Sequence, residues 1–361
     1  MINPLGERLS NKIANMGFLC ALLVVVIHLS GDTVSKTMYL LLGMTTEGVC
    51  RIAVPFFFTT AGFLLAGRTD EVGWWGQSLK SRVRSLVVPF LLIGLINCGI
   101  ALVQTVGGNL LRGRGVFAGL PDVGWWLTEM GFNPCAFPGH WVMWFVRALF
   151  LLVLVSPVLV WGLRRVGWGL VGGLFVVWTL TQPFVLGASE PILRLWGTTV
   201  SVSGFFWFTL GLQLRLTGAR LTCRWPMHLA ALVVGLLLVA GRLVWNLSSE
   251  HALPGYWVNW LYIGLMLWGA WGLSPGCVRI KTAWMAFPIF LIHGYVIAAL
   301  RLTGIPPSYA SPEHFVFEGC VVIAASMSAA HALARYVPGL ARILFGGRTL
   351  STNQHAEIRC R

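Results

Sequence analysis

The feature that most constrains this chain is a series of long apolar runs separated by short segments that hold most of its charges. A membrane-spanning helix needs roughly 20 mostly apolar residues, because the hydrocarbon core is about 30 Å thick and a helix rises about 1.5 Å per residue. Runs of about that length occur at 14–30, 50–67, 85–106, 141–163, 168–187, 198–217, 227–246, 256–273, 283–302 and 315–337. The sequence therefore predicts an all-α polytopic transmembrane helical bundle of about ten spans.

Composition supports this class and disfavours others. Only 11% of the residues are charged, whereas soluble domains carry about 25%. A net charge of +14 could suggest a nucleic-acid partner, but the basic residues recur in short groups rather than in one patch, so none is expected. The eight cysteines show neither a CxxC pair nor metal-like Cys/His spacing, so no metal site is predicted. One disulfide between Cys50 and Cys135 stays open.

The distribution of Lys and Arg predicts the orientation. With the N-terminus inside, the inner segments hold 18 of these residues and the outer loops hold four, as the positive-inside rule requires. Both ends are thus expected in the cytoplasm. The first apolar run lacks a cleavage site like that of a signal peptide, so it is interpreted as an uncleaved span. We expect a transmembrane domain at 1–342 and a disordered cytoplasmic tail at 343–361.

Four arginines fall within or at the edge of predicted spans, toward their outer half: Arg51, Arg147, Arg242 and Arg301. An isolated charge in hydrocarbon costs roughly 3 kcal/mol on insertion scales, so such residues usually face a polar cavity or a partner. Snorkelling from a helix end is the alternative for Arg242 and Arg301.

His28 is the strongest candidate for chemistry. It lies near the outer end of the first span, and Asp32 follows four residues later. On a continued helix this spacing places the carboxylate over the imidazole, which would orient the ring and raise its basicity. Such a histidine could act as a general base toward a hydroxyl. The alternative is a helix-end histidine hydrogen-bonded to a neighbouring helix. Glu47 and Arg51 have the same spacing and could pair.

A basic group precedes the third span and is predicted to be cytoplasmic. It consists of Lys80, Arg82 and Arg84. Such a cluster attracts anionic lipid head groups. Alternatively, it could hold the phosphates of a nucleotide-bearing donor.

Aromatic and basic residues enter the fourth span from outside. After His140, the residues Trp141, Trp144 and Arg147 lie close to one helical face. This arrangement suits sugar stacking, although tryptophan at a membrane interface is also an ordinary anchor. His293 lies in the middle of the ninth span, where it needs a polar partner, and is therefore counted with the site.

These stretches together resemble the acyltransferase 3 family of integral membrane acyltransferases. The resemblance covers nearly the whole chain and rests on His28, on Arg51 to Phe58 with Ala61 to Phe63, on Lys80 to Pro89, on His140 to Phe145, on Phe206 to Gly211 and on Phe290 to His293. It implies that His28 is the catalytic histidine and that Arg51 matches the arginine before V-P-F-F. It also implies that Lys80, Arg82 and Arg84 match the basic motif linked to the acyl-CoA donor.

The resemblance implies an acyltransferase in a bacterial inner membrane. It would move an acyl group, typically acetyl, from cytoplasmic acyl-CoA, a co-substrate rather than a bound cofactor, to a hydroxyl of a surface glycan or glycolipid. In the expected mechanism, His28 aided by Asp32 deprotonates the hydroxyl, and Arg51 or Arg147 stabilises the oxyanion. Where the family often has Arg or Lys, this chain has Gly17. A transporter or glycan exporter is the competing class, and a non-catalytic relative is a third possibility.

Overall fold

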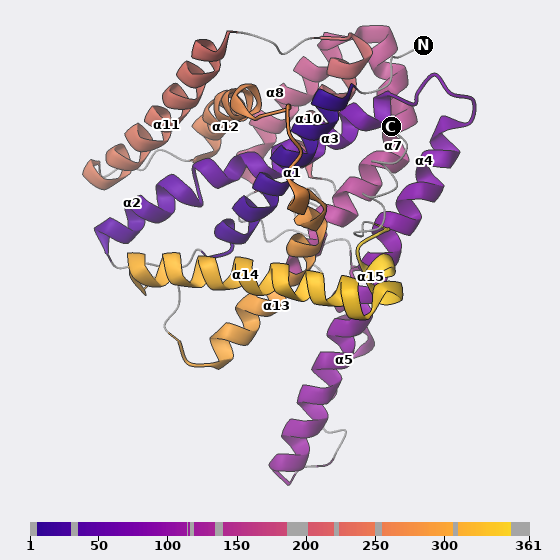
Figure 1. Cartoon of the computed structure of the whole chain (residues 1–361), viewed down its shortest axis with the longest axis vertical. Helices are drawn as coiled ribbons and strands as arrows, with labels where there is room; N and C mark the ends of the chain where they lie inside the picture. Colours follow the sequence, from indigo (N-terminus) through magenta and orange to yellow (C-terminus); the bar gives the residue numbers. More distant parts are fainter. Residues whose placement is uncertain are drawn as a thin grey trace.

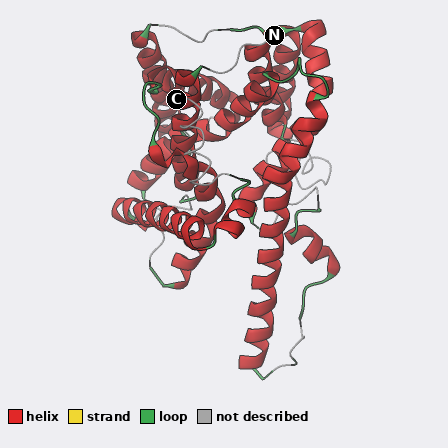
Figure 2. Cartoon of the chain, turned by 45° about the vertical axis from the view of Figure 1, so that its right-hand side comes forward, coloured by secondary structure: helices red, strands yellow, loops and turns green. Residues whose placement is uncertain are grey.

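The fold is built from helices that follow the apolar runs. The computed structural model describes residues 6–29, 35–113, 115, 119–133, 140–185, 201–219, 224–249, 255–305 and 310–347, and within them it contains helices and no strands (Figure 2). Each predicted span corresponds to one helix in Figure 1: α1 (Glu7–Ile27), α3 (Ala53–Ala66), α5 (Val88–Leu111), α7 (Trp144–Val166), α8 (Trp168–Val185), α10 (Val202–Leu216), α11 (Trp225–Ser248), α12 (Gly255–Leu273), α13 (Ala286–Leu302) and α14 (Pro312–Tyr336). The all-α prediction is confirmed.

Shorter elements precede or follow the long helices and were not predicted. They are α2 (Lys36–Thr45), the 3-10 turn η1 (Val49–Ile52), α4 (Trp74–Arg82), the π-helical turn η2 (Val83–Val87), α6 (Val123–Glu129), η3 (Trp141–Met143), η5 (Lys281–Met285) and α15 (Pro338–Leu344). Through η2, α4 runs without a break into α5, whose far end projects beyond the rest of the bundle in Figure 1.

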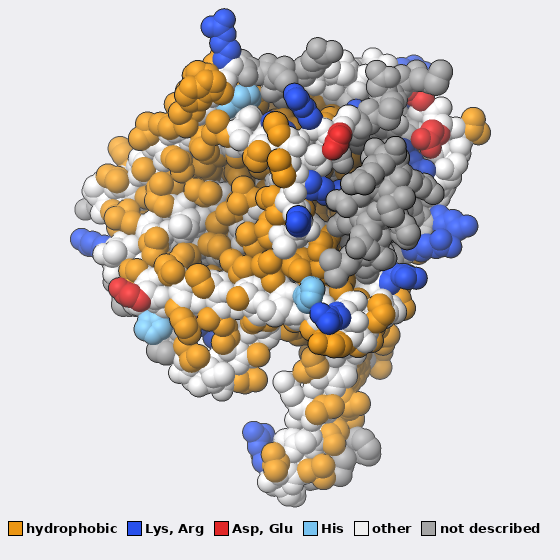
Figure 3. All heavy atoms as spheres, viewed as in Figure 1, with side chains coloured by type: hydrophobic (Ala, Val, Ile, Leu, Met, Phe, Trp, Pro, Cys, Tyr) orange, Lys and Arg blue, Asp and Glu red, His pale blue; other side chains and the backbone are white. Residues whose placement is uncertain are grey.

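The described helices have the length and polarity of an integral membrane protein. Within the part of the chain that the structure describes, seven stretches are long and apolar enough to cross a membrane: Glu7–Ile27, Lys36–Ala66, Trp74–Leu111, Trp144–Val166, Trp225–Ser248, Lys281–Leu302 and Pro312–Tyr336. Apolar side chains also cover much of the face in Figure 3. Such a surface is favourable against lipid and unfavourable in water. The count of ten spans and the cytoplasmic position of both ends stay predictions.

Helices α3 and α10 pack closely in the core. A Cβ atom at Gly62 would collide with the backbone oxygen of Phe208, and one at Gly211 with that of Thr59. Small residues let membrane helices approach this closely. α1 packs between this region and α13, and contacts both α3 and α13. The first helix is therefore central, which places His28 inside the bundle rather than at its edge.

The C-terminal part of the described chain folds onto α5 and η2. The predicted boundary at residue 342 falls inside α15, and the side chains of Leu344 and Phe345 are buried. Gly346 has a positive φ of 60° and packs against the backbone of Ser85. Residues 343–347 thus contact the helical domain, while 348–361 lie outside the described residues.

Candidate active site

The site begins where α1 ends. The helix stops at Ile27, and His28 forms its C-cap. The ring of His28 stacks on that of His293 from α13, with centroids 5.3 Å apart and planes inclined by 17°. Two histidines from opposite ends of the sequence therefore meet. Because α1 ends at Ile27, the helix does not continue toward Asp32, and Asp32 itself lies outside the described residues.

The backbone of α13 sets the proton position on His293. The His293 ring is fully buried, and its Nδ1 lies 3.0 Å from the carbonyl oxygen of Ile289. A carbonyl oxygen only accepts, so Nδ1 carries the proton and donates, which leaves Nε2 as the acceptor of the neutral ring. The polar partner expected for a mid-span histidine is thus supplied partly by its own helix.

His140 joins these two histidines from the segment before η3. Its Nε2–H donates to the carbonyl oxygen of Leu291, 2.9 Å away, and its ring stacks on Tyr295 at 4.5 Å. A Cβ atom at Gly294 would lie 2.6 Å from the His140 ring, so only glycine permits this approach. Burial lowers the pKa of His140 and favours its neutral form. Sequence reasoning missed Gly294 and Tyr295, although a glycine beside a mid-span histidine was the available signal.

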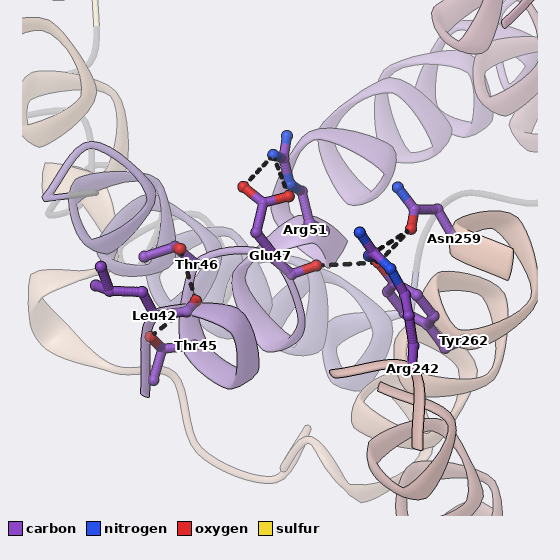
Figure 4. A network of polar contacts seen from close by, with 8 residues as sticks. All are labelled: Leu42, Thr45, Thr46, Glu47, Arg51, Arg242, Asn259 and Tyr262. Carbon is purple, nitrogen blue, oxygen red and sulfur yellow. Dashed lines mark hydrogen bonds and ion pairs between the residues drawn. The ribbon is translucent and has the colours of Figure 1, made fainter. Parts of the chain in front are cut away.

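Arg51 carries a positive charge that acts on His28. Its Nη2 contacts both carboxylate oxygens of Glu47, at 2.6 and 2.7 Å, which confirms the predicted pair (Figure 4). The side chains of Arg51 and Glu47 are 42% and 43% exposed, so a ligand can reach both. The charge of Arg51 also acts electrostatically on His28. Arg51 thus lies within electrostatic range of His28, and its charge is partly compensated by Glu47.

A buried polar network holds the turn that precedes Arg51. The hydroxyl of Tyr262 lies 3.0 Å from the Glu47 carbonyl oxygen and 2.5 Å from Oδ1 of Asn259. Arg242 donates to Oδ1 of Asn259 and to the Tyr262 hydroxyl, at 3.2 and 3.4 Å (Figure 4). These contacts tie α11 and α12 to the turn that leads into η1. Arg242 therefore has inward polar partners, as does Arg301, which pairs with Glu318 on α14 at 3.1 Å.

The remaining residues predicted on the outer side are placed differently. Nη1 of Arg147 donates to the carbonyl oxygens of Gly131 and Asn133, at 3.3 and 2.8 Å, so it holds the segment after α6. Trp144 packs edge-on against Phe145. The side chain of Trp141 lies outside the described part of the structure. Of the predicted acceptor-side group, only His140 and His293 are shown to gather with His28.

A cavity of about 510 Å³ lies among α1, α3, α7 and α13. It is mostly apolar, and it is lined by Ala14, Gly17, Phe57, Thr60, Ala61, Leu64, Arg82, Leu86, Phe145, Val146, Leu149, Arg279, Ala283, Trp284, Ala286, Phe287, Phe290 and Gly347. Of the predicted basic group, only Arg82 lines the cavity, whereas Lys80 and Arg84 are exposed and are not part of its wall. Arg279 joins Arg82 there, although the sequence had suggested only a topological role for Arg279.

The loop that carries Arg279 is fastened to α1 by one buried side chain. Nδ2 of Asn15 donates to the carbonyl oxygens of Pro275 and Val278, at 3.0 and 2.8 Å. Its Oδ1 accepts from the backbone N–H of Ile280 at 2.8 Å. Asn15 and Gly17 precede His28 by more than ten residues, so Arg279 is held roughly 16 Å or more along α1 from His28.

The comparison with protein families assigns the chain to a family. A family model described as an acyltransferase domain matches residues 15–331, a range that contains the histidines, Arg51, Arg82 and Arg279. The chain belongs to the acyltransferase 3 family. No curated protein and no solved structure matches it. The family and the apolar helices together indicate an integral membrane acyltransferase, as the sequence motifs predicted.

Proposed function

We propose that this acyltransferase 3 protein moves an acyl group, most simply acetyl, from cytoplasmic acyl-CoA to a hydroxyl of a glycan or glycolipid on the other side of a bacterial inner membrane. One observation carries the proposal: a cavity with two arginines on its wall also reaches Phe290, whose ring contacts the buried His293. The proposed donor cavity and the histidines thus lie next to each other within one helical bundle.

The cavity has the features that an acyl-CoA donor requires. Arg82 is half-buried and Arg279 is exposed, so this pair marks the end of the cavity that opens to the surface. Guanidinium groups bind phosphate through paired, charge-assisted hydrogen bonds. Apolar walls suit a flexible thioester arm. Lys80 and Arg84, exposed nearby, add positive charge that attracts the donor or anionic lipid. With this end in the cytoplasm, the N-terminus lies inside, in agreement with the positive-inside rule.

The chemistry needs one base and one centre of positive charge. His28 removes the proton of the acceptor hydroxyl, and the oxygen attacks the thioester carbonyl. Arg51 stabilises the oxyanion. The C–S bond then breaks, the new ester leaves with the acceptor, and the thiolate takes the proton from His28 to release CoA. His293 contacts one face of the His28 ring and limits its orientation. Asp32 assists His28 in this proposal.

The acceptor is proposed to bind on the His140 side of the histidines. His140 and His293 are already there, and Trp141 and Trp144 would supply aromatic faces for a sugar ring. Arg147 contributes by holding the segment after α6 in place rather than by touching the oxyanion. No resident cofactor is required by this scheme, since the acyl group arrives on its carrier.

His28→Ala tests the base. In membranes supplied with radiolabelled acyl-CoA, we expect acyl transfer to fall by about 10²–10⁴-fold, the usual contribution of a general base. His331→Ala is the matched control, because His331 is exposed on α14. Undiminished transfer by His28→Ala at equal expression would end the proposal. A transporter or exporter is distinguished with purified protein in detergent, because a carrier neither transfers nor hydrolyses the acyl group.

A further inference from the structure

The cavity stops one side chain short of the histidines. None of the described residues that line it is a histidine, and its wall toward the histidines contains Phe145 and Phe290. The Phe290 ring lies 5.8 Å from Phe145 and 6.3 Å from His293, measured between centroids. His293 in turn stacks on His28. A thioester held in the cavity is therefore separated from His28 by an aromatic layer.

The ring of Phe290 is packed between other aromatic rings of the cavity wall and His293. It is 7% exposed and stacks on Phe287 with centroids 6.2 Å apart and planes inclined by 15°. Phe145, from α7, is braced by Phe57 and Phe58, at 5.9 and 4.8 Å. Phe290 lines the cavity and also has a ring contact with His293. The three-residue spacing of Phe290 and His293 places both on one face of α13.

A barrier between the cavity and the histidines protects the thioester from hydrolysis. A thioester beside an activating histidine can react with water as well as with the acceptor. In hydrolysis, the water oxygen bonds to the acyl carbon, the C–S bond breaks, and a carboxylate and the CoA thiol leave. Group-transfer sites prevent this loss by excluding water until both substrates are bound.

We propose that Phe290, packed against Phe145, is an aromatic gate between the donor cavity and the His28–His293 pair, and that it selects acyl transfer over hydrolysis. This inference rests on the proposed function. Because side chains move between staggered rotamers, rotation of Phe290 alone would open the path without displacing α13. When open, the gate lets the thioester reach His28. When closed, it prevents water in the cavity from reaching the histidines.

Thiol labelling tests the barrier independently of catalysis. His28→Cys is introduced into a chain whose eight native cysteines are replaced by alanine. A negatively charged methanethiosulfonate is added from the side on which Arg82 and Arg279 lie. We expect Phe290→Ala to raise the labelling rate roughly tenfold, because it removes the ring that excludes solvent. Phe290→Leu should give an intermediate rate. Phe317→Ala, which removes an exposed ring on α14 that is not part of the cavity wall, should leave the rate unchanged.

The second measurement is the ratio of acyl-CoA hydrolysis to acyl transfer. In the chain with its native histidine, we expect Phe290→Ala to raise the ratio of acyl-CoA hydrolysis to transfer, and Phe317→Ala to leave that ratio unchanged. Unaltered labelling in Phe290→Ala and Phe290→Leu, or an equal rise in Phe317→Ala, would overturn the gate. If labelling follows the expected pattern but no variant turns over acyl-CoA, the gate stands and the proposed function falls.

Discussion

Replacing Gly17 with leucine should obstruct the donor cavity while leaving the fold intact. A Cβ atom at position 17 meets only the Phe56 ring, at 3.8 Å, so a larger side chain has room to enter the cavity. A leucine side chain brings four carbons, and displaced donor contacts are worth about 0.8 kcal/mol per CH₂ group. The loss is then about 3 kcal/mol, which corresponds to a rise of about a hundredfold in the KM for acyl-CoA.

The assay is the initial rate of CoA release at varied acyl-CoA concentration. Gly99→Leu is the matched control, because Gly99 also lies in a helix, is exposed, and a Cβ atom there meets nothing within 4 Å. Leucine is favoured over glycine in helices by up to about 1 kcal/mol, so neither variant should unfold more easily. An unchanged KM in folded Gly17→Leu would refute the route of the donor through this cavity.

Three further outcomes follow from the packing around the site. Tyr262→Phe removes the hydroxyl that holds the Glu47 carbonyl, so thermal unfolding in detergent should show a loss of about 1–2 kcal/mol, and kcat should fall with it. For His140, burial lowers the folded-state pKa, so its stabilising effect is present above the ordinary value of 6.5 and is lost as pH falls. The Tm of His140→Gln should therefore decline less than that of the unaltered protein between about pH 7 and pH 5. Gly211→Ala should cost about 2 kcal/mol, because its Cβ meets the facing backbone, whereas Gly172→Ala, in open space on α8, should not.

The positions of the long helices could be predicted because apolar length is a local property. Each of the ten apolar runs contains a helix in the structure. The shorter elements α2 and α4 were missed, since neither is long enough to span a membrane and each lies in a segment interpreted as a loop. For the basic group Lys80, Arg82 and Arg84, the sequence alone could not show which side chain lines the cavity. Its three residues are equivalent in sequence, yet only Arg82 faces the cavity, because the course of α4 and η2 decides which side chain points inward.

The candidate histidines could be found from the sequence, but their arrangement could not. His28 and His293 stand out because an imidazole within an apolar run is costly unless it has a partner. Their stacking depends on the packing of α1 against α13, and the approach of His140 depends on the absence of a Cβ at Gly294. Arg279 had no sequence signal beyond its charge, since its place at the cavity follows from contacts that Asn15 makes with a distant loop.

The sequence by itself determined that this is a helical membrane protein of the acyltransferase 3 family, with basic residues grouped between its apolar runs. Those properties reside in stretches of chain that can be interpreted one at a time. Only the tertiary structure decided that three histidines from distant segments share one site, that Arg82 and Arg279 share one cavity, and that Phe290 stands between the two. These relations arise where helices cross, because the close approach of side chains there depends on packing between segments far apart in the chain.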